Sequence, residues 1–167
     1  TADYCSIIPL LSSLKEKFAP KDDLAISFPS TRVDALKPEL LQEVQTIRRS
    51  GFTIAPEAGT QRLRDVINKG VTDEQLMETC RNVFKLGWNS IKMYFMIGLP
   101  TETDEDIYGI VELGRRVKDI AGRSNDITVS VSTLVPKPHT PFQWAAQITP
   151  AETRRKQEIL RRELKKY

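Results

Sequence analysis

Apolar positions along the chain fall into two alternating patterns, which predict alternating helices and strands. Compact apolar runs, typical of strands buried in a parallel sheet, occur at 24–28, 52–55, 91–97 and 126–134. Apolar residues spaced three and four positions apart predict helices at 4–18, 38–50, 61–67, 72–87, 103–122 and 150–167. Each strand is thus followed by a helix, an order that requires parallel strands joined by right-handed connections.

Local signals mark the ends of several of these helices. Thr72 and Gln75 have the spacing of a capping box, and Thr149 is a second predicted cap. Gly87 and Gly122 follow the last apolar position of their helices, where a glycine commonly ends a helix. These signals support the alternating order independently of the apolar pattern.

Two architectures fit this order, a flavodoxin-like open sheet and part of a (β/α)₈ barrel. A whole barrel needs about 250 residues, so four strands make about half of one. The chain begins within a helix and ends on a charged helix without a stop signal, so we expect a piece of a longer protein. We predict an α/β fold in which residues 1–167 form a single domain, a partial (β/α) barrel of about four parallel strands with flanking helices.

The composition is that of a globular protein, with 40% hydrophobic and 28% charged residues. No apolar run approaches the roughly 20 residues of a membrane span, and no signal pattern begins the chain. We therefore predict a cytoplasmic location without membrane attachment. Cys5 and Cys80 are too few for a disulfide framework, and we predict that both lie in the core.

Positive charge gathers at the end of the chain. The net charge is +3, and residues 150–167 alone carry seven basic and three acidic side chains. Such a basic helix can bind phosphates. The more common alternative is a solvated helix, here with Glu158 pairing with Arg161 and Arg162.

Function in parallel α/β folds collects where the strands end. The segments at these positions are Ser30-Thr31-Arg32, Pro56-Glu57-Ala58-Gly59-Thr60-Gln61, Ile97-Gly98-Leu99-Pro100 and Val135-Pro136-Lys137-Pro138-His139-Thr140-Pro141-Phe142. With Asn68-Lys69-Gly70-Val71-Thr72 between them, their order resembles the second half of a radical S-adenosylmethionine (radical SAM) enzyme barrel. The similarity covers residues 24–142. It is to the branch that contains oxygen-independent coproporphyrinogen oxidases, methylthiotransferases and cobalamin-binding members.

This resemblance implies an iron–sulfur oxidoreductase. Members hold a [4Fe–4S] cluster on a Cys-x₃-Cys-x₂-Cys loop, and the cluster cleaves S-adenosylmethionine to a 5′-deoxyadenosyl radical. This chain lacks that motif and the glycine-rich loop for the methionyl amine, and two isolated cysteines cannot hold such a cluster. We therefore expect strands 3 to 6 of the barrel plus the basic helix, inactive without the missing N-terminal half of the same protein. The substrate stays open among tRNA, porphyrinogens and peptides.

The resemblance implies several ligands for S-adenosylmethionine. Glu57 would bind the ribose or the methionyl end; alternatively its charge favours the following helix N-terminus. Lys69 matches a position where relatives often place an arginine that pairs with the methionyl carboxylate. Ser30 and Arg32 either reach the same pocket or form a surface turn. Tyr94 either lies near the ribose or is a core aromatic residue.

The resemblance also implies an adenine-binding wall. Ile97 would offer an apolar face, Gly98 would permit close approach of the backbone, and Val135 would hydrogen-bond adenine through its backbone. The proline-rich loop after Val135 is expected to be rigid and lid-like. His139, the only histidine, is expected to be structural or near the substrate, since no second histidine could complete a metal site.

Two further expectations concern function and partners. The alternative function is a non-catalytic nucleotide- or RNA-binding module that uses the basic C-terminal helix. A hydrolase on an open sheet is excluded, because no nucleophile elbow or phosphate-binding glycine loop is present. A half barrel would leave the strands at 24–28 and 126–134 as open edges, which predicts an edge-to-edge homodimer.

Overall fold

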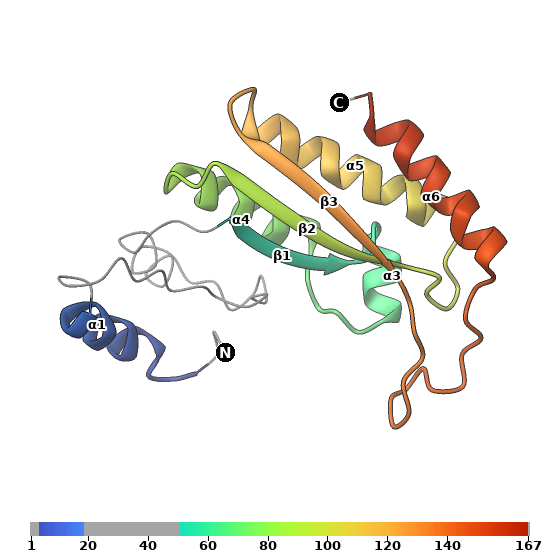
Figure 1. The fold of residues 1–167 in the computed structure, drawn as a ribbon, viewed down its shortest axis with the longest axis horizontal. Helices are drawn as coiled ribbons and strands as arrows, with labels where there is room; N and C mark the ends of the chain where they lie inside the picture. Colours follow the sequence, from blue (N-terminus) through green and yellow to red (C-terminus); the bar gives the residue numbers. More distant parts are fainter. Residues whose placement is uncertain (1–3, 19–50, 167) are drawn as a thin grey trace.

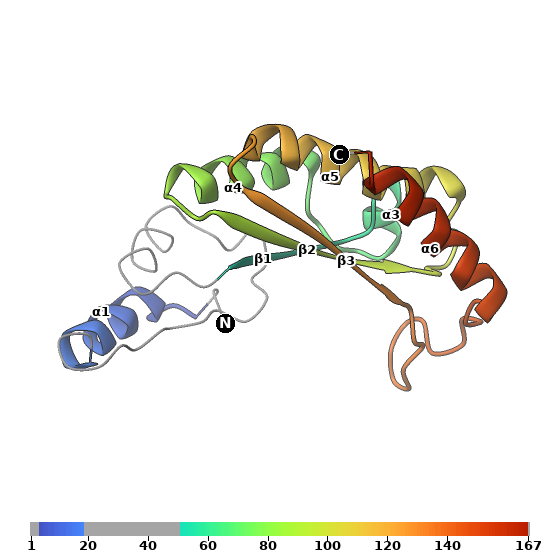
Figure 2. The same cartoon turned by 45° about the horizontal axis from the view of Figure 1, so that its top comes forward.

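The computed structural model describes residues 4–18 and 51–166. Three parallel strands form its sheet in the order β1-β2-β3: β1 (Phe52–Glu57), β2 (Ser90–Ile97) and β3 (Asp126–Thr133). The helices are α1 (Ile7–Phe18), α3 (Gln61–Val66), α4 (Asp73–Lys85), α5 (Asp104–Ala121) and α6 (Pro150–Leu164). Figures 1 and 2 show α4, α5 and α6 on one face of the sheet, and the strands curve away from them.

The predicted α/β fold is confirmed, with parallel strands that each precede a helix. Three of the four predicted strands appear within a few residues of their expected bounds, an arrangement consistent with a partial (β/α) barrel. The strand expected at 24–28, the helix expected at 38–50, and Ser30 and Arg32 lie outside the described residues.

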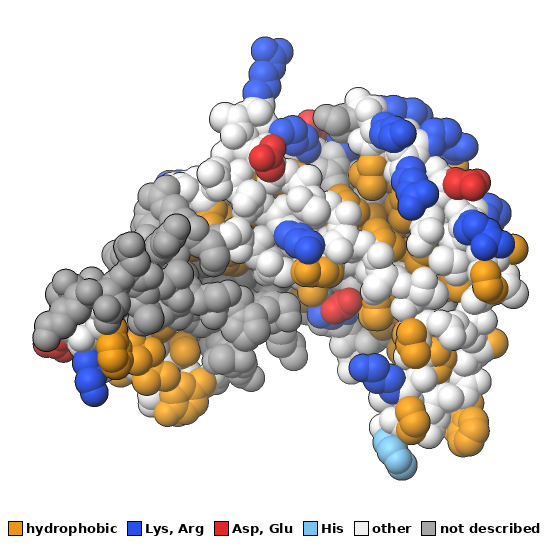
Figure 3. Space-filling view, in the orientation of Figure 1, with side chains coloured by type: hydrophobic (Ala, Val, Ile, Leu, Met, Phe, Trp, Pro, Cys, Tyr) orange, Lys and Arg blue, Asp and Glu red, His pale blue; other side chains and the backbone are white. Residues whose placement is uncertain are grey.

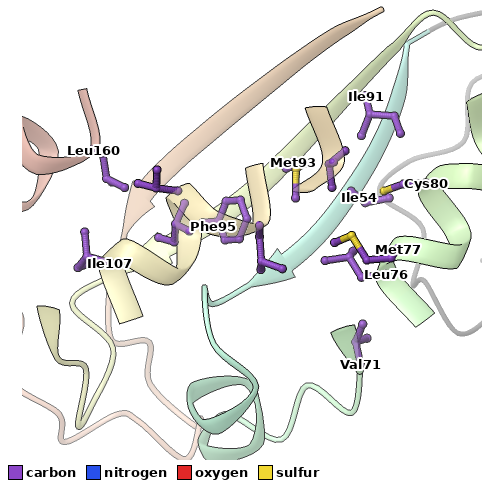
Figure 4. Close-up of a cluster of buried hydrophobic side chains, with 14 of the residues drawn as sticks. Ile54, Val71, Leu76, Met77, Cys80, Ile91, Met93, Phe95, Ile107 and Leu160 are labelled. Carbon is purple, nitrogen blue, oxygen red and sulfur yellow. The ribbon is translucent and has the colours of Figure 1, made fainter. Parts of the chain in front are cut away.

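The core lies between the sheet and the helices. Alternate residues of β2 point into it and are fully buried, together with Ile54 of β1 and Leu76 and Cys80 of α4 (Figure 4). Burying this apolar surface supplies the main driving force for folding, at about 25 cal/mol per Å². The strand at 91–97 was expected to be buried, but only one of its faces is. Tyr94, on the other face, is 38% exposed.

The predicted helix caps are present. Gln75 N–H donates to the Thr72 hydroxyl over 3.2 Å, and the Thr72 N–H donates to the Gln75 side chain over 3.0 Å. Thr149 likewise accepts from the backbone at the start of α6. The ion pairs predicted for Glu158 are not formed; Arg162 instead contacts Glu163 over 2.8 Å. No helix in residues 4–18 or 51–166 is both long enough and apolar enough to cross a bilayer.

Candidate functional site

The carboxyl ends of the three strands meet at one edge of the sheet. Parallel pairing brings Glu57 of β1 level with Phe95 of β2, and the Leu134 N–H after β3 donates to the Ile97 carbonyl over 2.8 Å. The loops that follow β1, β2 and β3 therefore leave the sheet side by side. This is the edge at which parallel α/β folds hold ligands.

The end of β1 departs from regular strand geometry. Ile54 pairs with Met93 and Glu57 with Phe95, so three steps along β1 match two along β2. Pro56 lies within this bulge and has no backbone N–H to donate. Glu57 has a φ of 70°, in the left-handed region, which costs a residue other than glycine about 1–2 kcal/mol. The surroundings hold Glu57 in this conformation, and such backbone strain is concentrated at functional sites.

Two of the predicted ligands contact each other at this edge. Lys69 Nζ lies 3.1 Å from Glu57 Oε1, and their side chains are 22% and 25% exposed. Lys69 stands between Asn68 and Gly70, both with positive φ, in the tight turn that follows α3. Solvent reaches both charges, so each can exchange its partner for a ligand group of opposite charge. The carboxylate can accept from an amine or hydroxyls, and the ammonium can pair with a carboxylate.

A buried carboxylate joins the loop after β1 to the start of α5. Asp106 accepts hydrogen bonds from the Thr60 hydroxyl, from Arg62, and from the Thr103 N–H over 2.8 Å. Burial raises the pKa of Asp106, but these three hydrogen bonds and the Arg62 charge outweigh it and leave the pKa below its usual value. Asp106 thus remains charged at neutral pH and fixes the loop that begins at Glu57.

A fully buried arginine holds the same loop from the other side. Arg64 donates to the Ala58 carbonyl over 3.1 Å and to the Val71 carbonyl over 3.0 Å, and it pairs with Asp73. Arg116 reaches Asp73 from α5 over 2.6 Å. Burial raises the pKa of Asp73, but the two guanidinium groups more than compensate and lower it. No sequence motif distinguishes these residues, whose role is to position the loops around the Glu57–Lys69 pair.

The loop after β2 is fixed through its backbone. Gly98 has a φ of 82°, and its N–H donates to Glu102 Oε1 over 2.9 Å. The same oxygen lies 2.5 Å from Lys156 Nζ of α6, and the two side chains are only 2% and 6% exposed. A Cβ added to Gly98 would come within 2.9 Å of Ile148, so Ile148 covers this glycine.

The other predicted ligands lie in different surroundings. The Ile97 side chain is fully buried in the core on the helix side, so this residue offers only its backbone to the edge. Tyr94 is not a core aromatic residue, since it lies on the open face with Lys92 Nζ 4.8 Å from its ring centroid. Val135 is 58% exposed and begins a loop that projects from the edge and contains the exposed His139 (Figure 1). The apolar face expected of Ile97 therefore does not lie at the edge, whereas contacts of Gly98 and Val135 with adenine stay predictions.

The two cysteines do not fit an iron–sulfur cluster. Cys80 is confirmed as a core residue, and burial raises the pKa of its thiol to about 12, which disfavours the thiolate that a metal needs. Cys5 was predicted to be buried, but it is exposed near the start of α1. Within residues 4–18 and 51–166, no three His, Cys, Asp or Glu side chains group closely enough to hold a metal ion.

Comparison with known proteins places the chain in a family. The sequence profile of the radical SAM superfamily matches residues 3–114, which include β1, β2 and most of α5. An uncharacterized protein of the archaeon Methanocaldococcus jannaschii is 36% identical over 143 residues, which cover 84% of this chain and 29% of that protein. The chain therefore spans less than a third of the length of this relative. Since the family profile covers about two thirds of the sequence, the chain belongs to the radical SAM superfamily.

Proposed function

We propose that this chain supplies the adenosyl, ribose and methionyl side of the S-adenosylmethionine site in a radical SAM iron–sulfur oxidoreductase. The branch we propose is the one that contains coproporphyrinogen oxidases, methylthiotransferases and cobalamin-binding members. The observation that carries the proposal is the Glu57–Lys69 ion pair at the ligand-binding edge of a parallel sheet. This pair offers opposite charges to a ligand whose methionyl end is itself zwitterionic.

The residues of this chain would bind and orient the methionyl end. The Lys69 ammonium group would release Glu57 and pair with the methionyl carboxylate instead. Glu57 would then accept hydrogen bonds from the amine or from ribose hydroxyls. Because the loop after β1 is held by Asp106 and Arg64, the pair keeps its position when its partners change. The [4Fe–4S] cluster has no suitable ligands in this chain, so we propose that a Cys-x₃-Cys-x₂-Cys motif precedes Thr1 in the longer protein. A preceding reading frame without this motif would contradict the proposal.

The binding role is tested with the 167-residue chain and two charge-removing variants. We expect saturable binding of S-adenosylmethionine by calorimetry, weakened about tenfold in both Glu57→Gln and Lys69→Gln, because each removes one charge-assisted contact. Lys85→Gln, on the exposed surface of α4, is the matched control and should bind as the unsubstituted chain does. Equal affinity in all four chains, or no saturable binding by the unsubstituted chain, would contradict the proposal.

No observation favours the alternative of an RNA-binding module based on α6. Part of the basic charge of this helix is already used within the fold. Arg155 lies 2.6 Å from Asp104 and 2.7 Å from Glu152, and Lys156 is buried against Glu102.

We also propose that β3 mediates an edge-to-edge homodimer. Among the described strands β3 pairs only with β2, and a cleft of about 470 Å³ beside it is lined in part by Ile127, Val129 and Leu164. Unpaired strand edges invite pairing with another chain. The N–H groups of Asp126 and Leu134 donate toward β2, so the odd-numbered residues between them direct their N–H groups outward.

The dimer is tested by light scattering over a range of protein concentrations. We expect the mean mass of the unsubstituted chain to rise toward that of a dimer. Thr133→Pro removes one outward N–H without breaking the β2–β3 ladder, and it should shift the equilibrium toward monomer. Circular dichroism checks that the variant is folded. A mass that stays monomeric at high concentration would exclude this homodimer.

A further inference from the structure

The two faces of the sheet have opposite chemical character. On the helix side, the residues of β2 and β3 are apolar and contribute to the core. On the open side lie mainly polar residues, namely Lys92, Tyr94 and Met96 of β2 and Thr128, Ser130 and Ser132 of β3. Figure 3 looks onto this face, where white polar surface and blue basic side chains are visible among orange hydrophobic ones. The interior face of a packed barrel carries bulky branched apolar residues, so this face suits a space that holds a polar ligand.

Lys92 places a positive charge on this face. Its Nζ lies 4.8 Å from the centre of the Tyr94 ring, a cation–π contact that holds the ammonium group in place. In the part of the chain that the structure describes, Lys92 forms this contact with Tyr94 and no ion pair with a carboxylate. Its charge is therefore available to an anion.

Two residues with hydroxyl groups lie beside Lys92 and Tyr94 on the neighbouring strand. Lys92 pairs in register with Thr128, and Tyr94 with Ser130, across strands that lie about 4.8 Å apart. Ser132 hydrogen-bonds to the Phe95 carbonyl over 3.5 Å, whereas the Thr128 and Ser130 hydroxyls have no protein partner among residues 4–18 and 51–166. The face thus presents one point charge and separate hydroxyl donors.

We propose that this face binds a phosphoryl group of the substrate, with Lys92 supplying the charge and Thr128 and Ser130 donating hydrogen bonds. A phosphoryl group matches the donors because its oxygens point in several directions. Lysine binds such a group as a point charge, and the separate hydroxyls of Thr128 and Ser130 can each reach a different oxygen. Tyr94 lies three residues before the end of β2, so the bound group would lie about 10 Å below the carboxyl edge. The inference rests on the proposed function, since the rest of such a substrate would extend toward S-adenosylmethionine at that edge.

The test uses inorganic pyrophosphate as the probe and the ¹⁵N-labelled 167-residue chain. At constant ionic strength, we expect saturable shifts of the amide signals of Lys92, Tyr94 and Ser130. The dissociation constant should rise about tenfold in Lys92→Gln and remain within twofold in the control Lys85→Gln, which removes the same charge from the helix side. Malonate, the carboxylate probe, should bind at least tenfold more weakly than pyrophosphate.

Each possible result either supports or contradicts the phosphoryl site. The absence of saturable shifts, equal affinity in Lys92→Gln, or preference for malonate would overturn it. Measuring S-adenosylmethionine binding on the same samples separates it from the proposed function. Lys92→Gln should leave that binding unchanged, and loss of pyrophosphate binding alone would refute only the phosphoryl site. Pyrophosphate binding without S-adenosylmethionine binding would refute the proposed function instead.

Discussion

Replacing Lys156 with methionine is expected to lower the free energy of unfolding by about 3–5 kcal/mol. The substitution removes the ammonium group but keeps the length of the side chain, so the apolar packing of the stem survives. It leaves Glu102 with a charge that is almost completely shielded from water and that, among the described residues, keeps only the Gly98 N–H as a close partner. An unpaired buried charge costs far more than the net gain from forming the pair. Urea unfolding followed by circular dichroism measures the loss as a lower midpoint at unchanged slope.

The double variant Lys156→Met with Glu102→Gln tests the cause. Glutamine retains a carbonyl oxygen that can accept from Gly98 N–H, but it brings no charge, so most of the lost stability should return. Arg154→Met, on the exposed side of the same helix, should change the unfolding free energy by less than about 0.5 kcal/mol. If the double variant is as unstable as Lys156→Met alone, the unpaired charge is not the reason for the loss.

The sequence predicts the features of this fold that depend on local pattern. The capping box of Thr72 and Gln75 involves residues three positions apart, so it can be predicted from a short stretch of sequence. The strands were recognised from apolar runs, and their parallel pairing followed from the helices between them. Glu57 and Lys69 were each expected to bind the same ligand, and the structure brings them into contact across twelve positions and one short helix.

Features that depend on distant contacts were missed. Lys156 looked like one of several solvated charges on a basic helix, but it lies against Glu102, 54 positions earlier. No local pattern distinguishes Arg64 or Asp106 either, although both are buried and hydrogen-bonded to residues from other segments. The one-sided burial of β2 did have a signal, because Lys92 and Tyr94 interrupt the apolar run at alternate positions. The alternation of polar and apolar residues along β2 predicts a strand with one buried face and one exposed face.

Replacing Gly59 with alanine is expected to destabilise the chain by about 3 kcal/mol. A Cβ at this position would lie 2.2 Å from the Asp106 carbonyl oxygen and 2.3 Å from the Ile110 nitrogen. Both are backbone atoms of α5, so no side chain can rotate away, and either the loop or the helix must move. The loop begins at Glu57, so the variant should also weaken S-adenosylmethionine binding. Urea unfolding and calorimetry measure the two effects on the same preparation.

Alanine substitutions at two other glycines provide comparisons for Gly59→Ala. Among the described residues, a Cβ at Gly51 would meet only the Ser90 hydroxyl, at 3.2 Å, so Gly51→Ala should stay within about 0.5 kcal/mol of the unsubstituted chain. At Gly109, inside α5, the clash with Gly59 begins at 2.9 Å and is partly offset by the higher helix propensity of alanine, worth about 1 kcal/mol. The expected order of instability is therefore Gly59→Ala, then Gly109→Ala, then Gly51→Ala. An unfolding free energy of Gly59→Ala equal to that of Gly51→Ala would show that the loop can withdraw from α5 without cost, and Glu57 would then not be held rigidly at the edge.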